Sequence, residues 1–171
     1  MSFKVLRTKE TGTTKIAEPQ PPTSTLNLKQ MKPTYYIGDL CYVMHNEWDE
    51  VCELLFPHGS GERTGRLHLK DGREFFIFGT EHGDGEYKDQ FGNTYGVDSG
   101  TIGAIRVADI RDTTYTEDLI NDLGCIHTFN TLLTSSDCSY DNGEITFRNV
   151  VIDTKPQYFD EEDEEDDEDF E

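Results

Sequence analysis

The sequence has none of the long apolar segments found in membrane and secreted proteins. No stretch reaches the roughly 20 apolar residues that a membrane-spanning helix needs, and the first ten residues, MSFKVLRTKE, lack the apolar core of a signal peptide. No internal repeat of solenoid or propeller length is present either. We therefore expect a cytoplasmic protein that does not act at a membrane.

Cysteine is scarce, and its spacing does not suit a structural metal site. The four cysteines, Cys41, Cys52, Cys125 and Cys138, include no CxxC pair, and no histidine lies at zinc-finger distance from them. In a reducing cytoplasm free thiols are the expected state. Cys41 and Cys52 fall in apolar stretches, where thiols pack as small hydrophobic side chains. We expect no metal site and no cofactor.

Positive charge is scarce relative to negative charge. The chain has 15 Lys and Arg against 35 Asp and Glu, which gives a formal net charge of −20 at pH 7. A protein that binds DNA, RNA or an anionic membrane needs a basic surface to neutralise phosphate groups, so we expect no direct contact with nucleic acid. This charge instead favours a partner protein with a basic surface.

Charge and apolar content divide the chain into three parts. Residues 1–33 are rich in Thr, Lys and Pro, carry a net charge of +4, and show neither strand nor helix periodicity. Residues 160–171, DEEDEEDDEDFE, contain eleven carboxylates and one apolar residue. Neither end has enough apolar surface to offset the entropy of ordering. We predict a flexible basic arm over 1–33, a globular domain over 34–159 and a disordered acidic tail over 160–171.

The globular part reads as short strands separated by turn signals. Asp71–Gly72 and Phe91–Asn93 lie between alternating apolar residues and predict two β-hairpins, and Gly38–Asp39 predicts a turn or bulge. The strand-like segments are 34–44, 66–80, 86–97, 101–110 and 143–154. This pattern predicts an α+β fold, mainly an antiparallel β-sheet of hairpins arranged as a sandwich or partly open barrel, with one or two short helices packed on it.

Two helices are predicted, and residues 125–133 fit either a strand or a helix. The first helix follows Asn46 as its cap, ends at Pro57, and has an apolar face made of Trp48, Val51, Cys52, Leu55 and Phe56. The second spans residues 114–124 and closes at Gly124. In the strand 101–110, the side chains expected to face the core are Ile102, Ile105 and Val107.

The segment HGDGEYKDQFGNTYGVDSGTIG, residues 82–103, carries the glycines and aspartates from which a site could be built. As a calcium loop starting at Asp84 it has Glu86 at the third position, but Lys88 at the fifth and Tyr95 at the twelfth do not fit an EF-hand. Glycine-led turns, with aspartates that cap backbone N–H groups, explain the composition better. The alternative is a less regular cation site.

Two hydrolytic mechanisms, that of an aspartic protease and that of a serine nucleophile, can be tested against the same segment. VDSGT, residues 97–101, is similar to the active-site signature of the pepsin and retropepsin families, which implies Asp98 as one half of a carboxylate pair. The chain holds no second copy of this motif, so a homodimer would be required. Ser99 does not lie in a Gly-x-Ser-x-Gly elbow between a strand and a helix. We expect no catalytic residue.

A polar pocket is the remaining hypothesis for this segment. If the hairpin ends converge on the Gly38–Asp39 turn, polar groups rimmed by tyrosines would suit a small ligand or a peptide. The residues of this candidate pocket are Asp39, Tyr42, His82, Asp84, Tyr87, Asp98 and Ser99. In the alternative interpretation, the aspartates are turn residues at separate ends of the sheet.

The acidic tail supports two interpretations. A run of like charges stays extended and keeps a protein in solution. The same run could compete with nucleic acid for a basic surface on a partner, with one aromatic anchor. The candidate partner-binding residues are Asp160, Glu161, Glu162, Asp163, Glu164, Glu165, Asp166, Asp167, Glu168, Asp169 and Phe170.

Two segments together resemble a known group of sequences. YYIGDLCYVM, from Tyr35, and GTEHGDGEYKDQFGNTYGVDSGTIGAI, from Gly79, are similar to an IGDxCYV start and a GDGxYxDxxGxxYxVDSGxIG segment in small uncharacterised phage and bacterial proteins. In that group a proline stands where this chain has Leu40. The resemblance implies a phage or bacterial setting and a compact β-rich fold, and carries no known activity.

These observations lead to one main expectation about function. We expect a non-enzymatic acidic binding or accessory protein, encoded by a phage and located in the host cytoplasm, that modulates a host or viral partner protein. The alternative is a small hydrolase, either metal-assisted or a dimeric aspartic-protease-like enzyme built on Asp98.

Overall fold

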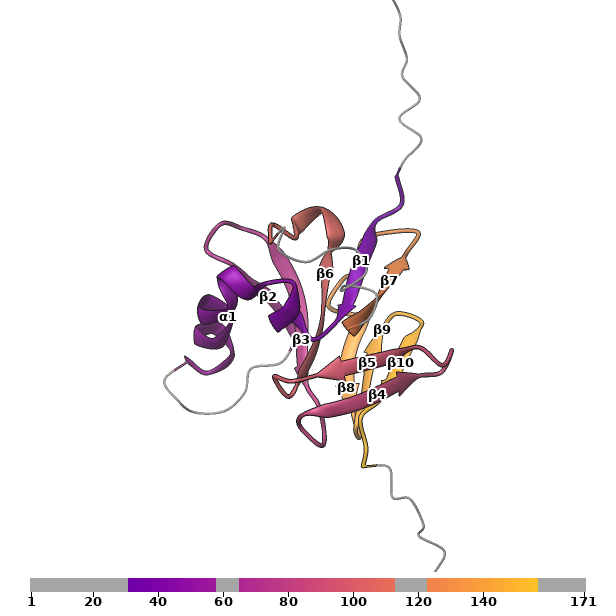
Figure 1. Cartoon of the computed structure of the whole chain (residues 1–171). Helices are drawn as coiled ribbons and strands as arrows, with labels where there is room; N and C mark the ends of the chain where they lie inside the picture. The colour runs from indigo at the N-terminus through magenta and orange to yellow at the C-terminus, as the bar shows by residue number, and fades with distance from the viewer. Residues whose placement is uncertain (1–30, 58–64, 113–122, 157–171) are drawn as a thin grey trace, which may run out of the picture. The chain divides into compact units, whose positions relative to one another are not determined.

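The computed structural model describes residues 31–57, 65–112 and 123–156. The described residues from Lys32 onward belong to one compact unit. This unit consists mainly of two antiparallel five-stranded sheets, neither of which closes into a barrel, with one short α-helix (Figure 1). The predicted α+β class is therefore confirmed. The arm and the acidic tail, predicted over 1–33 and 160–171, lie almost entirely outside the described residues.

The first sheet has the strand order β2-β3-β6-β1-β7. Its strands are β2 (Gly65–His68), β3 (Glu74–Gly79), β6 (Thr101–Arg106), β1 (Thr34–Gly38) and β7 (Gly124–Thr128). The second sheet has the order β5-β4-β10-β9-β8. Its strands are β5 (Thr94–Val97), β4 (Gly85–Asp89), β10 (Val150–Asp153), β9 (Glu144–Phe147) and β8 (Cys138–Asp141).

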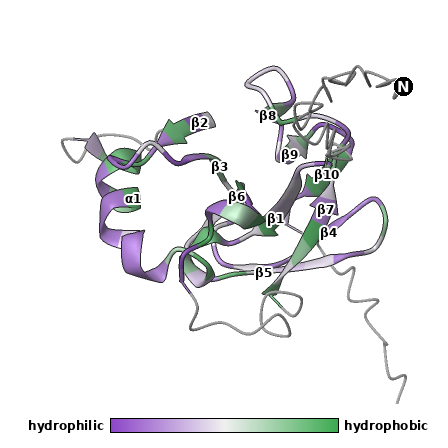
Figure 2. Ribbon diagram, turned by 90° about the horizontal axis from the view of Figure 1, so that it is seen from above, coloured by the Kyte–Doolittle hydropathy of each residue, from purple (hydrophilic) through white to green (hydrophobic). Residues whose placement is uncertain are grey.

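The first sheet is covered on both faces, and this produces three layers (Figures 1 and 2). Successive side chains of a strand point to opposite faces, so Tyr35 and Ile37 pack in the core between the two sheets, whereas Tyr36 packs in the core under the helix. The helix α1 (Trp48–Leu55) supplies Val51 and Leu55 to that second core. Because the central strands β1, β3 and β6 are buried on both faces, they lack the simple polar–apolar alternation of an exposed sheet, which the edge strands β2 and β7 keep.

Close packing between these layers explains one glycine of β6. A Cβ atom on Gly103 would lie 2.5 Å from Cδ1 of Leu40 and 2.5 Å from the carbonyl oxygen of Phe76. Leu40 follows β1 and belongs to the core under the helix, and Phe76 lies on β3 beside β6. The TIGAI segment therefore needs glycine because the backbone of β6 is in contact with the layer that covers it.

The predicted turns at Gly38–Asp39, Asp71–Gly72 and Phe91–Asn93 are confirmed. The strand β1 ends at Gly38 and a short 3-10 turn, Leu40–Tyr42, follows. The hairpins β2–β3 and β4–β5 turn at glycines with positive φ, +89° at Gly72 and +85° at Gly92. Residues 125–128, which fitted either element, belong to the strand β7.

The C-terminal part departs from the prediction, because residues 143–154 form two strands instead of one. The strands β9 and β10 are joined by Arg148–Asn149, and Arg148 has a φ of +58°. Its guanidinium donates to the carbonyls of Thr131 and Leu132 and pairs with Asp137, so tertiary contacts hold a turn for which the sequence has no glycine signal. The strand β8 was also missed.

Three smaller predictions are wrong. Asn46 does not cap the helix, because a 3-10 turn, His45–Glu47, precedes Trp48, and Glu47 occupies the cap position without a side-chain bond. Phe56 is 49% exposed, since the helix ends at Leu55. Val107 is 38% exposed because β6 ends at Arg106. The predicted helix over 114–124 falls mostly outside the described residues.

Candidate functional site

The IGD segment at the end of β1 and the VDSG segment at the end of β5 meet in the structure. The carboxylate of Asp39 is fully buried and accepts four hydrogen bonds. Its donors are the backbone N–H groups of Cys41 (3.0 Å), Asp98 (2.8 Å) and Ser99 (2.7 Å) and the hydroxyl of Ser99 (2.7 Å). The sequence therefore places Asp39 in a turn so that one side chain joins two loops that are about 60 residues apart.

This geometry makes Asp39 a structural residue. Both of its oxygens accept hydrogen bonds from the surrounding loops, and one of them receives the backbone N–H of Asp98. A carboxylate engaged in this way is not arranged to share a proton with the side chain of Asp98, as an aspartic-protease pair would require. The hydroxyl of Ser99 contacts Asp39 and Thr101, and no histidine of the described ranges is bonded to it. A nucleophilic serine would need such a base.

Two further groups beside Asp39 are held in their protonated forms. The phenol of Tyr42 donates to the exposed carboxylate of Asp98 at 2.6 Å. Burial and this hydrogen bond raise the pKa of Tyr42. Burial, followed by the negative charge of Asp39, raises the pKa of the Cys41 thiol. A reactive cysteine needs a lowered thiol pKa, so Cys41 is not suited to act as a nucleophile.

The β3–β4 loop brings the other predicted residues to the same end of the domain. The carbonyl of Gly83 accepts hydrogen bonds from Thr80 (2.6 Å) and from the phenol of Tyr87 (2.7 Å). The hydroxyl of Tyr87 therefore holds the loop in place through its hydrogen bond to Gly83. Asp84 and His82 are exposed on this loop.

The predicted pocket residues thus gather only in part. Asp39, Tyr42, Asp98 and Ser99 are linked by hydrogen bonds, and a Cβ atom on Gly100 in the same loop would lie 3.8 Å from Asp84. Two cavities among the described residues are lined by other residues. Within the described ranges, no group of three or more His, Cys, Asp or Glu side chains is arranged to hold a metal ion.

Several loops at this end of the domain are joined to one another. The backbone N–H of Thr80 donates to Gly100 (2.9 Å), that of Glu81 donates to the hydroxyl of Thr154 (3.0 Å), and that of Thr154 donates to Gly143 (2.8 Å). The β3–β4 loop therefore lies beside the β5–β6 loop, the β8–β9 turn and the end of β10. Exposed carboxylates on these segments define what we call the acidic end: Glu81, Asp84, Asp98, Asp141, Glu144 and Asp153.

Three of these carboxylates form a row on the outer face of the second sheet. Asp141 is paired in register with Glu144, and Glu144 with Asp153, across three adjacent strands. Like charges directly opposite each other repel. Lys155 pairs with Glu144 at 3.3 Å, and Lys88 lies next to Asp153 in register. The row therefore has three carboxylates and two neighbouring lysines.

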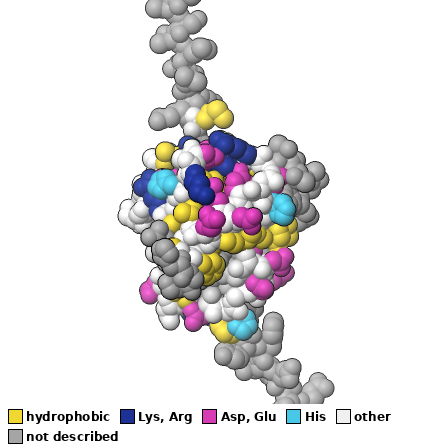
Figure 3. All heavy atoms as spheres, turned by 90° about the vertical axis from the view of Figure 1, so that its left-hand side faces the viewer, with side chains coloured by type: hydrophobic (Ala, Val, Ile, Leu, Met, Phe, Trp, Pro, Cys, Tyr) yellow, Lys and Arg dark blue, Asp and Glu magenta, His cyan; other side chains and the backbone are white. Residues whose placement is uncertain are grey.

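The opposite end of the first sheet, which we call the paired end, arranges its charges differently. The side chain of Arg73 is only 8% exposed and bonds Asp71 (2.8 Å), Glu47 (2.5 Å) and the carbonyl of Asp109 (2.9 Å). Arg111 adds a second bond to Asp71 at 2.7 Å. On the face seen in Figure 3, Lys and Arg side chains are confined to the upper half of the view.

Sequence reasoning missed one polar chain in the interior. Asp89, nearly buried on β4, accepts the phenol of Tyr95 at 2.9 Å, and the phenol oxygen lies 3.2 Å from Nε2 of His127 on β7. Burial lowers the pKa of His127. The three residues come from both sheets. The only sequence signal for this contact is that His127 stands in a largely apolar segment, where a histidine needs a hydrogen-bond partner.

Comparison with known proteins identifies no relative. No protein-family model matches the sequence, no curated protein matches it, and no solved structure matches the fold. The described residues contain no helix that is both long and apolar enough to cross a membrane.

Proposed function

We propose that this protein is a non-enzymatic binding protein that attaches through its acidic end to a basic surface on a partner protein and modulates that partner. The observation that carries this proposal is the row of Asp141, Glu144 and Asp153, in which adjacent strands hold like charges side by side. Like charges directly opposite each other repel, and Lys155 and Lys88 offset this repulsion only in part, because the row has three carboxylates and two cations. A cationic partner would relieve the repulsion.

The acidic tail extends the same proposal. The described chain ends at Pro156, just after the acidic end, and residues 160–171 add eleven carboxylates to the sequence that follows. A run of carboxylates of this kind attracts basic surfaces that otherwise bind nucleic acid. We infer a phage setting from the resemblance of the IGD and VDSG segments, with a host or viral nucleic-acid-binding protein as the class of partner.

The proposal is tested with a synthetic peptide of alternating Arg and Thr as the probe. Binding to the full chain and to a chain ending at Phe159 is measured by isothermal titration calorimetry at about 0.1 M and about 1 M salt, between which the Debye length falls from about 10 Å to about 3 Å. We expect binding at low salt, loss of binding at high salt, and weaker binding without the tail. Binding that ignores both salt and the tail would refute the proposal.

A further inference from the structure

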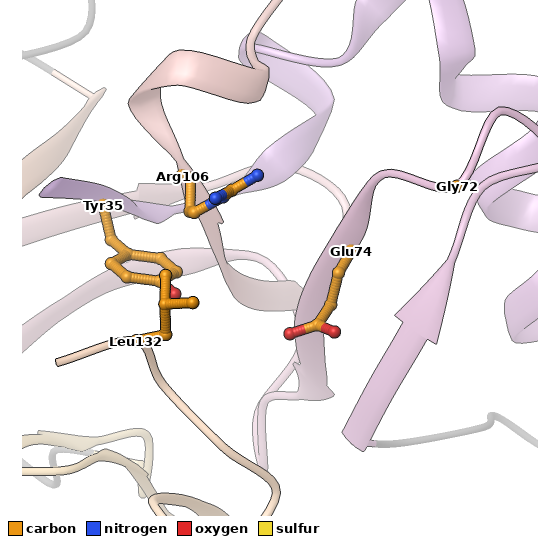
Figure 4. Close-up of a pocket in the computed structure, with 5 residues that line it drawn as sticks. All are labelled: Tyr35, Gly72, Glu74, Arg106 and Leu132. Atoms are coloured by element: carbon orange, nitrogen blue, oxygen red, sulfur yellow. The ribbon is translucent and has the colours of Figure 1, made fainter. Parts of the chain in front are cut away.

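A small cavity opens at the other end of β1 from Asp39. Its volume is about 220 Å³, and its walls are Tyr35, Gly72, Glu74, Arg106 and Leu132 (Figure 4). Tyr35 is paired in register with Arg106. One position beyond the Phe75–Ile105 pair, Glu74 on β3 lies opposite Arg106 on β6. The three polar walls therefore stand in one row across β1, β6 and β3.

The cavity separates two opposite charges that the sheet places next to each other. Paired residues of adjacent strands have Cβ atoms about 5 Å apart, so a carboxylate and a guanidinium there normally attract each other. Glu74 instead pairs with Arg66 and with Nε2 of His68 (3.3 Å) on β2. Arg106 is held by Asp109 through Nε (2.6 Å) and Nη2 (3.1 Å). Because each charge has its own partner, no ion pair closes the space between Glu74 and Arg106.

Each polar wall keeps one hydrogen-bonding position without a partner among the described residues. The hydroxyl of Tyr35 accepts the backbone N–H of Leu133 at 3.1 Å, but its proton has no acceptor, although Tyr35 is only 3% exposed. Nη1 of Arg106 and Oε1 of Glu74 also have no partner among these residues. The cavity therefore presents two donors on one side and a charged acceptor on the other.

We propose that this cavity binds a small aliphatic α-amino acid as its zwitterion. The ligand carboxylate accepts hydrogen bonds from Nη1 of Arg106 and the hydroxyl of Tyr35, and the ligand ammonium donates to Oε1 of Glu74. The Tyr35 ring and Leu132 contact the aliphatic side chain. Pockets for drug-sized ligands measure about 300–1,000 Å³, so this cavity admits alanine or valine but not a peptide. The site is independent of the acidic end.

The probe is L-valine, titrated into the full-length protein and followed by ¹H–¹⁵N NMR. We expect saturable shifts of the backbone amides of Gly72, Leu132 and Leu133. Valinamide lacks the carboxylate and isovalerate lacks the ammonium, and each loses a charge-assisted hydrogen bond, so both bind about tenfold more weakly than valine. Equal affinity for the three compounds, or no saturable shift with valine, overturns the proposal.

Variants identify which wall holds which ligand group. Glu74→Gln weakens the binding of valine about tenfold, and the variant then binds valine and isovalerate with equal affinity. Arg106→Gln makes the affinities for valine and valinamide equal. If either residue had only a structural role, its substitution would weaken the binding of all three compounds alike. Leu132→Trp, at a 52% exposed position, blocks the cavity and abolishes binding. Glu53→Gln is the matched control, because it removes an exposed, paired carboxylate outside the cavity and the acidic end. Unchanged ligand preferences in the two wall variants contradict the assignment.

Discussion

The two ends of this domain use charged residues in opposite ways. At the paired end, Arg73 is almost buried and joins Glu47, Asp71 and the backbone of Asp109. At the acidic end, the exposed carboxylate of Asp141 has no ion pair among the described residues, whereas the buried carboxylate of Asp39 is held by hydrogen bonds from two loops. The comparison shows that burial and hydrogen bonding, and not charge alone, separate residues that stabilise this domain from residues that remain available to a partner.

The largest stability effect is expected at Asp39. Asp39→Ala leaves the buried N–H groups of Cys41, Asp98 and Ser99 without acceptors, so we expect the free energy of unfolding to fall by about 3 kcal/mol in urea titrations. The control is Asp98→Ala, which removes an exposed carboxylate bonded only through Tyr42. If both variants lose the same stability, Asp39 does not join the two loops as described.

A smaller loss is expected at the paired end. Arg73→Met removes the guanidinium that neutralises the half-buried carboxylate of Glu47, and we expect a loss of about 2 kcal/mol in the same urea titration. Lys155→Met is the control, because its partner Glu144 is exposed and such surface pairs contribute about 0.5 kcal/mol. A negligible effect of Arg73→Met would mean that the paired end does not stabilise the fold.

Neutralising the acidic row should have the opposite sign. Asp141→Asn with Glu144→Gln removes the two like-charge contacts of the row and also the surface pair between Glu144 and Lys155, which offsets part of the gain. We therefore expect a net gain of about 0.5 kcal/mol in the free energy of unfolding. The control is Asp49→Asn with Glu53→Gln on α1, which changes the net charge equally outside the row. A clear loss of stability in the first double variant would place these carboxylates among the structural charges.

Acidification should reduce stability in two gradual stages. Burial lowers the pKa of His127, so the unfolded chain takes up this proton first as the pH falls below about 6.5, and stability decreases from there. Hydrogen bonds from Arg148 and Thr134 lower the pKa of Asp137, which adds a second loss below about pH 4. Thermal unfolding of His127→Gln and Asp137→Asn across this range should each flatten one stage. An unchanged profile in both variants would contradict these assignments.

The parts of the fold that depend on local signals could be predicted from the sequence. Gly72 and Gly92 have positive φ in turns that flank alternating apolar residues, and Gly38 ends a strand. The Asn142–Gly143 turn between β8 and β9 carries an equally strong hairpin signal, which the prediction missed. Arg148 could not be predicted as a turn residue, because contacts with distant carbonyls hold its positive φ.

The candidate site shows the same limit. The aspartates of the IGD and VDSG segments were identified from their turn chemistry, and the structure joins Asp39 to Asp98 and Ser99. Asp39 is buried because it contacts a loop that is distant in the sequence, and a local sequence pattern does not reveal such a contact. Glu74 and Arg106 of the cavity are 32 positions apart in the sequence and become neighbours only through the register of β3 and β6.

The salt dependence of binding to the Arg–Thr peptide, compared between two double variants, tests the role of the acidic end most directly. The wild-type protein and the Asp49→Asn, Glu53→Gln variant should bind alike at about 0.1 M salt, whereas the Asp141→Asn, Glu144→Gln variant should bind several-fold more weakly and lose less affinity towards about 1 M salt. Equal affinity and equal salt dependence in all three proteins would contradict the account.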